Sequence, residues 1–268
     1  MKNNFEIIDA HCHIYPEKIA RAAVDGTDGF YGLHSVYGGT TADLLQRGRE
    51  NGIDRFVVQS VATTPHQVSK INHFIAEAAA LNAEFTGVGT LHPESEDIAA
   101  DIDELVSLGL HGVKLHPDIQ RFCVDDPRCL NIYEICSEKG LPILIHTGDY
   151  RYDFSNPNRM KPILQTYTDL TVIGAHFGGW SVWDDAAREM AGLPNLYVDT
   201  SSSFYSMTKE KALSLIRAYG PGHVLFGTDY PMWNGKDELD FMFSLDLTDA
   251  DFAAILSENA KRVYAVDK

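Results

Sequence analysis

The chain has 268 residues, a net charge of −16 and a pI of about 5.0. This length suits two small domains or one (β/α)8 barrel, a fold that takes about 250 residues. The acidity argues against nucleic acid, whose phosphates need a basic surface, and against an anionic membrane surface as partners. No stretch approaches the roughly 20 apolar residues that a membrane-spanning helix needs.

Eight apolar runs of strand length follow one another along the chain, and Val, Ile, Leu and Phe dominate them. They span residues 5–11, 54–60, 85–91, 111–116, 141–146, 171–176, 195–200 and 223–229. Several of these runs are apolar almost throughout, which is typical of parallel strands that are buried on both faces.

Segments with helix signals separate most of these runs. They cover residues 41–52, 69–81, 97–108, 127–139, 157–167, 182–190 and 208–219, and a helical tail follows at 249–264. This alternation predicts parallel strands joined by helical crossovers. Eight such units close a barrel, whereas six would form an open, doubly wound sheet. We therefore predict an α/β protein with a single domain over residues 1–268, a (β/α)8 TIM barrel of regular or distorted shape.

Residues 15–40 interrupt the regular spacing after the first predicted strand. The segment holds Gly26, Gly29, Gly32, Gly38 and Gly39. We expect a loop insertion there that lies over the mouth of the barrel and acts as a lid.

The number of cysteines and the first residues of the chain indicate the cellular compartment. Cys12, Cys123, Cys129 and Cys136 form no Cys-x-x-Cys motif and are too few to suggest a disulfide framework. Residues 1–4 lead straight into a strand without the layout of a signal peptide. We expect a cytoplasmic protein.

Histidine and aspartate side chains stand at the ends of the predicted strands. His11 and His13 close the first run, His146 the fifth, His176 the sixth and Asp229 the eighth. A strand alternates its faces with period two, so His11 and His13 point the same way. In a barrel the carboxyl ends of the strands form the active site, and the first and eighth strands become neighbours. Imidazole and carboxylate ligands suit Zn²⁺, and also Mn²⁺ or Fe²⁺, so this pattern predicts a catalytic metal site.

Each of these residues has a simpler interpretation when it is taken alone. A single His-x-His is usually accidental, and His146 or His176 could be a half-buried structural histidine. Asp229 precedes Tyr230-Pro231 and could begin a turn, while Asp9 could orient a histidine through a hydrogen bond. Their joint placement at strand ends favours the metal site.

Five motifs and the closing segment, 255–264, occur together along the chain. The motifs are Asp9-Ala10-His11-Cys12-His13-Ile14-Tyr15-Pro16, Gly112-Val113-Lys114-Leu115-His116-Pro117, Ile145-His146-Thr147-Gly148, Ala175-His176-Phe177-Gly178-Gly179 and Gly227-Thr228-Asp229-Tyr230-Pro231. Together with the closing segment they resemble the amidohydrolase-related branch of the amidohydrolase superfamily, which includes aminocarboxymuconate-semialdehyde decarboxylase. The resemblance implies a distorted barrel with one divalent metal, usually zinc, held by His11, His13, His146 and Asp229. It also implies that His176 and Asp229 are catalytic and manage protons.

Lys114 leaves two alternatives open. In binuclear amidohydrolases a carboxylated lysine on the fourth strand bridges two metals, and His146 and His176 then bind the second ion. In the mononuclear branch the lysine ammonium contacts a carboxylate of the protein or of the substrate, and we favour this interpretation because a Lys-x-His-Pro at this place is usual there.

Loops after the strands should determine specificity. His116, Lys114, Arg151 and Trp233 are candidate substrate-binding residues, and Arg121 is a further cation near the mouth. Guanidinium groups grip carboxylates in a bidentate fork, so an arginine among aromatic side chains suits a small planar or carboxylated substrate. The competing interpretation is packing, with Arg151 paired to Asp153.

The leading functional hypothesis is a metal-dependent hydrolase that uses a metal-activated water on an ester, lactone or amide of a small molecule. The alternative is a lyase, a non-oxidative decarboxylase of a small aromatic or unsaturated acid, because fold and ligands do not fix the reaction. A non-catalytic metal-binding scaffold is disfavoured, since the ligand set is intact. Barrels of this kind often form homodimers, but no patch in the sequence decides the matter.

Overall fold

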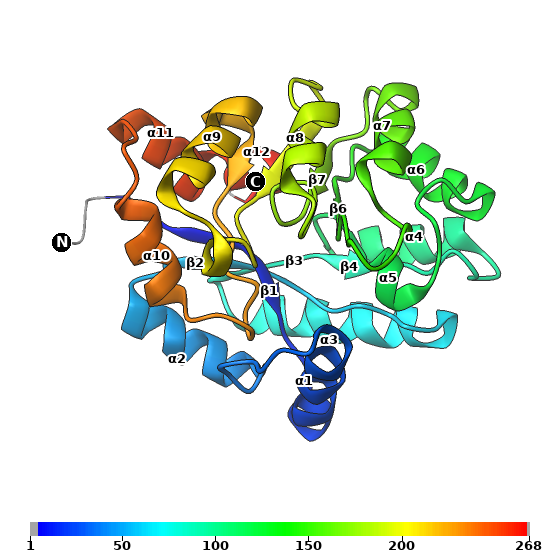
Figure 1. Cartoon of the computed structure of the whole chain (residues 1–268). Coiled ribbons are helices and arrows are strands. Elements are labelled where there is room, and N and C mark those ends of the chain that lie inside the picture. The colour runs from blue at the N-terminus through cyan, green and yellow to red at the C-terminus, as the bar shows by residue number, and fades with distance from the viewer. Residues whose placement is uncertain (1–4, 267–268) are drawn as a thin grey trace.

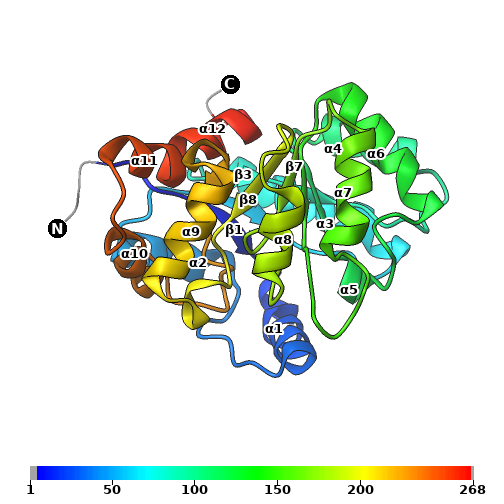
Figure 2. The same ribbon diagram turned by 45° about the horizontal axis from the view of Figure 1, so that its top comes forward.

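The computed structural model describes residues 5–266. Parallel strands form a barrel in the middle of the molecule, and helices surround it (Figure 1). A second view shows α9, α8 and α7 side by side along one flank (Figure 2). The expectation that no signal peptide is present falls on residues 1–4, which lie outside the described residues.

The strands pair in parallel, in two sheets whose orders are β1-β2-β3 and β4-β5-β6-β7-β8-β9. Their bounds are β1 Ile8–His13, β2 Arg55–Gln59, β3 Phe85–Gly87, β4 Gly89–Thr90, β5 Val113–Leu115, β6 Ile143–Ile145, β7 Val172–Gly174, β8 Leu196–Asp199 and β9 Val224–Leu225. Seven of the eight predicted runs contain their strands in full, and the third run contains both β3 and β4. The first run ends at residue 11, whereas β1 continues to His13.

Two sets of hydrogen bonds join the sheets into one barrel. The third run is broken only at Val88, whose N–H donates to Val58 O at 2.9 Å, while Gly89 N–H donates to Gly112 O at 3.0 Å. On the other side, Ala10 N–H donates to Phe226 O at 2.8 Å and His13 N–H to Tyr230 O at 2.7 Å. The first and eighth strand positions are therefore neighbours, as the barrel hypothesis requires.

The predicted helices are present with small shifts at their ends. They are α2 Thr41–Asn51, α3 Val68–Leu81, α4 Ile98–Ser107, α6 Pro127–Lys139, α7 Pro157–Thr166, α8 Trp183–Met190 and α9 Lys209–Tyr219. The helical tail consists of α11 Asp249–Ala253, a π-helical turn at Ala254–Glu258 and α12 Asn259–Tyr264. None of the described helices combines the length and the apolar character needed to cross a membrane.

Three helices were not predicted. The expectation of a plain loop at 15–40 is wrong, because α1 Glu17–Tyr31 occupies most of it; α5 Pro117–Gln120 and α10 Gly235–Phe243 are the other two. Gly26 and Gly29 lie inside α1, where each glycine costs about 1 kcal/mol relative to alanine. Burial of Ala20 and Val24 on one face of α1 offsets this cost.

Two apolar clusters form the core of the described structure. The smaller one joins strand residues such as Ala10, Leu144 and Ile173 to Ala260 and Tyr264 of α12. The larger one lies between the strands and the surrounding helices. The strands are thus buried on both faces, as their apolar sequences predict.

Candidate metal centre

Three of the four predicted metal ligands converge at the end of β1. His11 Nε2 lies 3.2 Å from His13 Nε2 and 3.3 Å from Asp229 Oδ1. The distance between Asp229 Oδ1 and His13 Nε2 is 3.5 Å. His11 and His13 therefore point to the same side of the strand, as the alternation predicted, despite an irregular register between Asp9 and Cys12. Two imidazole nitrogens and a carboxylate oxygen at these separations can hold a divalent ion.

The hydrogen bond between His11 and Asp199 determines which nitrogen of His11 faces the site. Asp199 ends β8, is fully buried, and accepts a hydrogen bond from His11 Nδ1 at 2.8 Å. The hydrogen of neutral His11 therefore resides on Nδ1, and Nε2 keeps its lone pair for a ligand. Ser201 Oγ donates to Asp199 and lies 3.0 Å from His11 Nδ1, so it holds the same pair in place.

A second chain of contacts fixes the carboxylate of Asp229. Trp233 Nε1 donates to Ser202 Oγ at 2.8 Å, and Ser202 Oγ donates to Asp229 Oδ2. The other oxygen, Oδ1, remains directed at His11 and His13. Trp233 thus acts through Ser202 on a predicted ligand and does not line the large cavity, in contrast to its predicted contact with substrate.

Burial and neighbouring charges set the protonation of these groups. Burial, reinforced by Lys114, holds the pKa of His13 well below its usual range, so that its imidazole is neutral. Burial alone would raise the pKa of Asp229, but His11, His176 and His13 outweigh it and hold that pKa below its ordinary value. A neutral imidazole at His13 and an anionic carboxylate at Asp229 are the forms that bind a metal.

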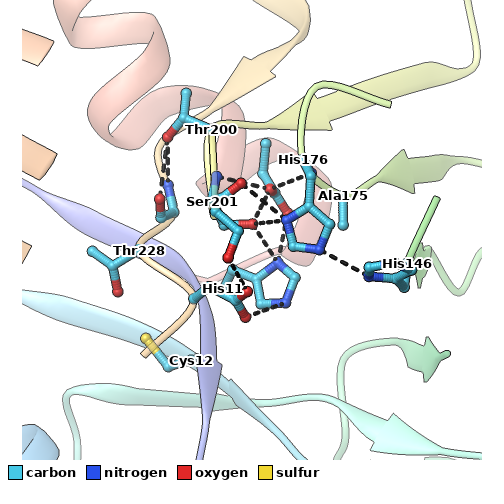
Figure 3. A network of polar contacts seen from close by, with 12 residues as sticks. His11, Cys12, His146, Ala175, His176, Thr200, Ser201 and Thr228 are labelled. Atoms are coloured by element: carbon cyan, nitrogen blue, oxygen red, sulfur yellow. Dashed lines mark hydrogen bonds and ion pairs between the residues drawn. The ribbon is translucent and has the colours of Figure 1, made fainter. Parts of the chain in front are cut away.

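His146 and His176 form a second pair next to the converging ligands. His146 Nδ1 lies 3.0 Å from His176 Nε2, and His176 Nδ1 donates to Ser201 O at 2.9 Å (Figure 3). Nε2 of His176 is therefore its unprotonated nitrogen, and burial lowers the pKa of His176 to about 4. The structure places the fourth predicted ligand, His146, beside the other three but in a separate group of potential ligand atoms.

That separate group consists of His116, Asp118 and His146, and its ring geometry argues against a second metal site. The rings of His116 and His146 are stacked with their centroids 4.0 Å apart and their planes 7° from parallel. An imidazole nitrogen binds a metal in the plane of its ring, and two stacked parallel rings share no such plane. One ion could bind both histidines only if a ring rotated.

Lys114 is fully buried and lies next to His11, one of the converging ligands. Its Nζ lies 3.2 Å from His11 Nε2. Burial lowers the pKa of Lys114 to about 8, although the charges of Asp229 and Asp199 oppose this. An ammonium that interacts electrostatically with two carboxylates is compatible with the mononuclear interpretation of this lysine.

The two predicted catalytic residues both have a left-handed backbone conformation, which they share with five other described non-glycine residues. His176 has φ 60° and Asp229 has φ 60°, a left-handed conformation that costs a residue with a side chain roughly 1 kcal/mol. His176 N–H donates to Asp199 Oδ1 at 3.0 Å, which helps to hold the turn. Such conformations cluster at functional sites, where the surrounding structure over-determines them.

A cavity of about 780 Å³ opens above these residues. Its inner end reaches His11, His13, Lys114, His116, His146, His176 and Asp229. Its outer walls include Tyr31 from α1, Phe74 from α3, Arg121 and Trp180. The combination of a polar floor and apolar walls is typical of a small-molecule site.

Arg151 does not line this cavity, so its predicted contact with substrate is not supported by its position. Its guanidinium forms a bidentate ion pair with Asp149, with Nη2 2.7 Å from Oδ2, and donates to Phe30 O at 2.8 Å. Asp149 is fully buried, so this pair holds the aromatic wall together. The alternative pairing of Arg151 with Asp153 is wrong, because Asp153 pairs with Arg159.

Arg121, in contrast, lines the cavity, and its guanidinium can interact with a bound ligand. It lies in the left-handed region with φ 62° at the end of α5. Within residues 5–266 its guanidinium has no ion-pair partner. A cation of this kind can bind the carboxylate of a ligand.

Asp199 and Tyr31 are among the residues of the site that the sequence analysis missed. Asp199 stands at the end of the seventh predicted run, so the rule that found Asp229 could have found it. Tyr31 belongs to a helix in a segment assigned to a loop, and its spacing carries no signal. Asp9 does not orient a histidine ring; it accepts hydrogen bonds from Thr228 Oγ1 at 2.6 Å and from His11 N–H at 3.2 Å.

Comparison with known proteins decides the family. A family model described as Amidohydrolase matches residues 8–266. The chain belongs to the amidohydrolase family. This agrees with the expected superfamily, and the chain is therefore an enzyme of a metal-dependent superfamily. No curated protein matches the chain by sequence.

Solved structures share the fold at low sequence identity. A TIM-barrel protein of Bordetella bronchiseptica has 22% identity and a TM-score of 0.79, with 98% of this chain and 99% of that chain covered. A dihydroxybenzoic acid decarboxylase of Polaromonas sp. JS666, with bound manganese and 2-nitroresorcinol, has 16% identity and a TM-score of 0.71 over 98% of both chains. A protein of Pseudomonas putida, provisionally described as a 2-pyrone-4,6-dicarboxylic acid hydrolase, has 17% identity and a TM-score of 0.70 over 99% and 100%. These likenesses confirm the barrel fold.

Proposed function

We propose that this enzyme is a metal-dependent, non-oxidative decarboxylase of small carboxylated aromatic compounds. The observation that carries the proposal is the convergence of His11, His13 and Asp229 on one point at the floor of a cavity with apolar walls. Decarboxylases of 5-carboxyvanillate or dihydroxybenzoate recur among the similar structures, which supports this reaction over hydrolysis. The ranking from sequence alone, which put hydrolysis first, is therefore reversed.

In this proposal His11, His13, His146 and Asp229 hold one divalent ion, either Zn²⁺ or Mn²⁺. The ion would act as a Lewis acid that polarises a substrate oxygen. The donor set fits either metal, because imidazole and carboxylate suit both. Rotation of the His146 side chain toward the other three ligands would complete the set.

The chain itself offers the groups that a decarboxylase needs. Arg121 lines the cavity and can bind the substrate carboxylate. Loss of carbon dioxide leaves a carbon that must be protonated, and Asp229, His176 and Lys114 are the groups at the cavity floor that exchange protons. Trp180 and Phe74 give the aromatic ring an apolar environment.

A panel assay tests this function. Protein loaded with Mn²⁺ or Zn²⁺ should release carbon dioxide from hydroxylated benzoic acids, and Asp229→Asn should reduce the rate at least 100-fold. Exposed Asp169 gives the control variant Asp169→Asn, which should retain the full rate. Hydrolysis of esters, lactones or amides without any release of carbon dioxide would overturn the proposal.

Hydrolysis by a metal-activated water remains the second candidate. The similarity to the Pseudomonas putida protein favours it, as does His176, whose unprotonated Nε2 can accept a proton from a water molecule. The same panel decides between the two reactions.

A further inference from the structure

The cavity above the metal ligands is larger than an acid with a single ring needs. Its volume is about 780 Å³, whereas an apolar cavity of about 150 Å³ is enough to hold benzene. The cavity extends from the buried floor with His11 and Asp229 to α1, which lies at the bottom of the molecule in both overall views (Figure 1, Figure 2). A ligand with one ring would therefore leave most of this space to water.

The part of the cavity between α1 and α3 is here called the outer arm. Positions 19, 22, 23 and 26 of α1 line it, and their spacing places them on one face of the helix. The residues that define the outer arm are Ile19, Ala22, Ala23 and Gly26 of α1 and Ile71 of α3. Ile19 is 52% exposed, and Ala22 and Gly26 are exposed as well, so this part of the cavity opens to solvent.

The large apolar side chains of the outer arm are incompletely packed. Ile71 packs against the larger apolar cluster and is only half-buried. Ile19 belongs to neither apolar cluster of residues 5–266. Apolar surface of this kind gains free energy when a ligand removes it from water. The outer arm can therefore contribute binding energy that the polar floor does not supply.

Contacts at the end of α1 give the outer arm a defined shape. The Tyr31 oxygen lies 2.9 Å from His116 Nε2, and its ring meets Trp180 edge-on with centroids 5.2 Å apart. Arg151 Nη1 donates to Phe30 O at 2.8 Å. A wall that is already in place loses little freedom when a ligand binds, so the outer arm is preorganised.

Charged residues next to the outer arm do not fill it. Lys70, His73 and Glu77 of α3 also line the cavity, and all three are exposed. Their charged ends can stay in water while a hydrocarbon group lies beside their apolar stems. Such a group would therefore remove no buried charge from water, which is the main cost that would oppose its binding.

We propose that the outer arm binds a hydrocarbon substituent of the substrate, so that the enzyme prefers an aromatic acid with an alkyl chain to the same acid without one. This inference rests on the proposed function, because it takes the reacting end of the ring to lie at the metal ligands. The opposite end of the ring then points outward. Phe74 lines the cavity as well, so the outer arm is continuous with the apolar environment proposed for the ring.

Two glycines of α1 provide a matched pair of variants. Gly26 lines the cavity and Gly29 does not, while a Cβ atom added at either position meets no atom within 4 Å. Both glycines lie inside the helix and neither has a positive φ, so leucine fits at either position and is the better helix former. Gly26→Leu should fill the outer arm, and Gly29→Leu is the control with the same substitution.

A series of product analogues tests the inference. Loss of carbon dioxide from 2,6-dihydroxybenzoic acid leaves resorcinol, whose position 5 lies opposite the carbon that carried the carboxylate. Dissociation constants of resorcinol, 5-methylresorcinol, 5-propylresorcinol and 5-pentylresorcinol would be measured by calorimetry with the manganese-loaded wild type, Gly26→Leu and Gly29→Leu. Elemental analysis and urea denaturation check that both variants keep the metal content and the stability of the wild type.

We expect the affinity of the wild type to rise about threefold for each carbon added to the chain. Gly26→Leu should weaken the binding of 5-pentylresorcinol about tenfold or more and change the binding of resorcinol less than about twofold, because only the longer ligand reaches the filled space. Gly29→Leu should bind the whole series as the wild type does.

Two results would overturn the inference and leave the proposed function intact. One is a wild type that binds resorcinol and 5-pentylresorcinol equally well. The other is an affinity that rises with chain length to the same extent in Gly26→Leu and Gly29→Leu, because the chain would then lie outside the outer arm. A wild type that binds none of the four ligands would instead count against the proposed aromatic-acid function and against this inference with it.

Discussion

The carboxylate of Asp199 and the imidazole of His11 are joined by a 2.8 Å hydrogen bond between two residues that are 188 positions apart. Burial alone would raise the pKa of Asp199, but the contacts with His11 and His176 outweigh it and hold the pKa well below its usual value. Asp199 is therefore an anion that keeps the hydrogen of His11 on Nδ1. It determines that Nε2 is the metal-binding atom.

Asp199→Asn should weaken metal binding 10- to 100-fold, because partners that orient a metal-bound histidine contribute about that much to affinity. An amide can present its N–H₂ to His11 Nδ1 and so favour the wrong tautomer. Zinc affinity measured by competition with a chelator checks this, with exposed Asp169→Asn as the matched control. Equal affinities in wild type and Asp199→Asn would show that His11 needs no such partner.

Elemental analysis should find about one divalent ion per chain. His13→Ala and Asp229→Ala should each lower the content to near zero. Lys114→Gln should keep about one ion, since Lys114 Nζ contacts His11 and need not bridge two metals. Two ions in the wild type that fall to one or none in Lys114→Gln would instead establish a carbamate bridge.

Arg121 and Arg151 should respond differently to the same substitution. Arg121→Gln should raise the KM for a carboxylated substrate tenfold or more with little effect on stability, because its guanidinium is free to bind a carboxylate. Arg151→Gln should lower the free energy of unfolding by about 3 kcal/mol, because buried Asp149 loses its partner. Steady-state kinetics and urea denaturation of both variants separate the two roles, and a reversal of the two effects would contradict this assignment.

We expect Glu238 to make the stability of the folded protein depend on pH. It is buried in the first turn of α10, and burial, with the charge of Asp9, raises the pKa of its carboxyl to about 8. The folded chain then holds a proton that the unfolded chain loses above pH ~4.5, so stability falls as the pH rises from about 4.5 to about 8.

Glu238→Gln should remove this dependence and stabilise the protein at pH ~9 by a few kcal/mol, on the order of 3–5. Urea denaturation at pH ~5 and pH ~9 measures the effect, with exposed Glu134→Gln on α6 as the control. A wild type and a Glu238→Gln variant with the same pH profile would show that Glu238 is not the titrating group.

The strands and the metal ligands could be predicted because both follow from local pattern. Apolar runs mark buried parallel strands, and polar residues at their ends, such as His11 and Asp229, must meet at one end of a barrel. The contacts of Arg151 and Tyr31 could not be predicted in this way. Both depend on how segments outside the strands fold over the barrel, and a glycine-rich segment such as 15–40 gives little indication that a helix forms there.

The hydrogen bonds from β1 to residues 226 and 230, which follow β9, have a consequence for how the barrel is held together. His11 and His13 belong to the first strand and Asp229 follows the last one, so an ion bound by all three would clamp the first strand to the segment after the last strand, across the seam where the barrel closes. Such an ion binds only the closed form and stabilises it by mass action. Metal uptake would then report the completion of folding, because the site does not exist until the final strand has docked against the first.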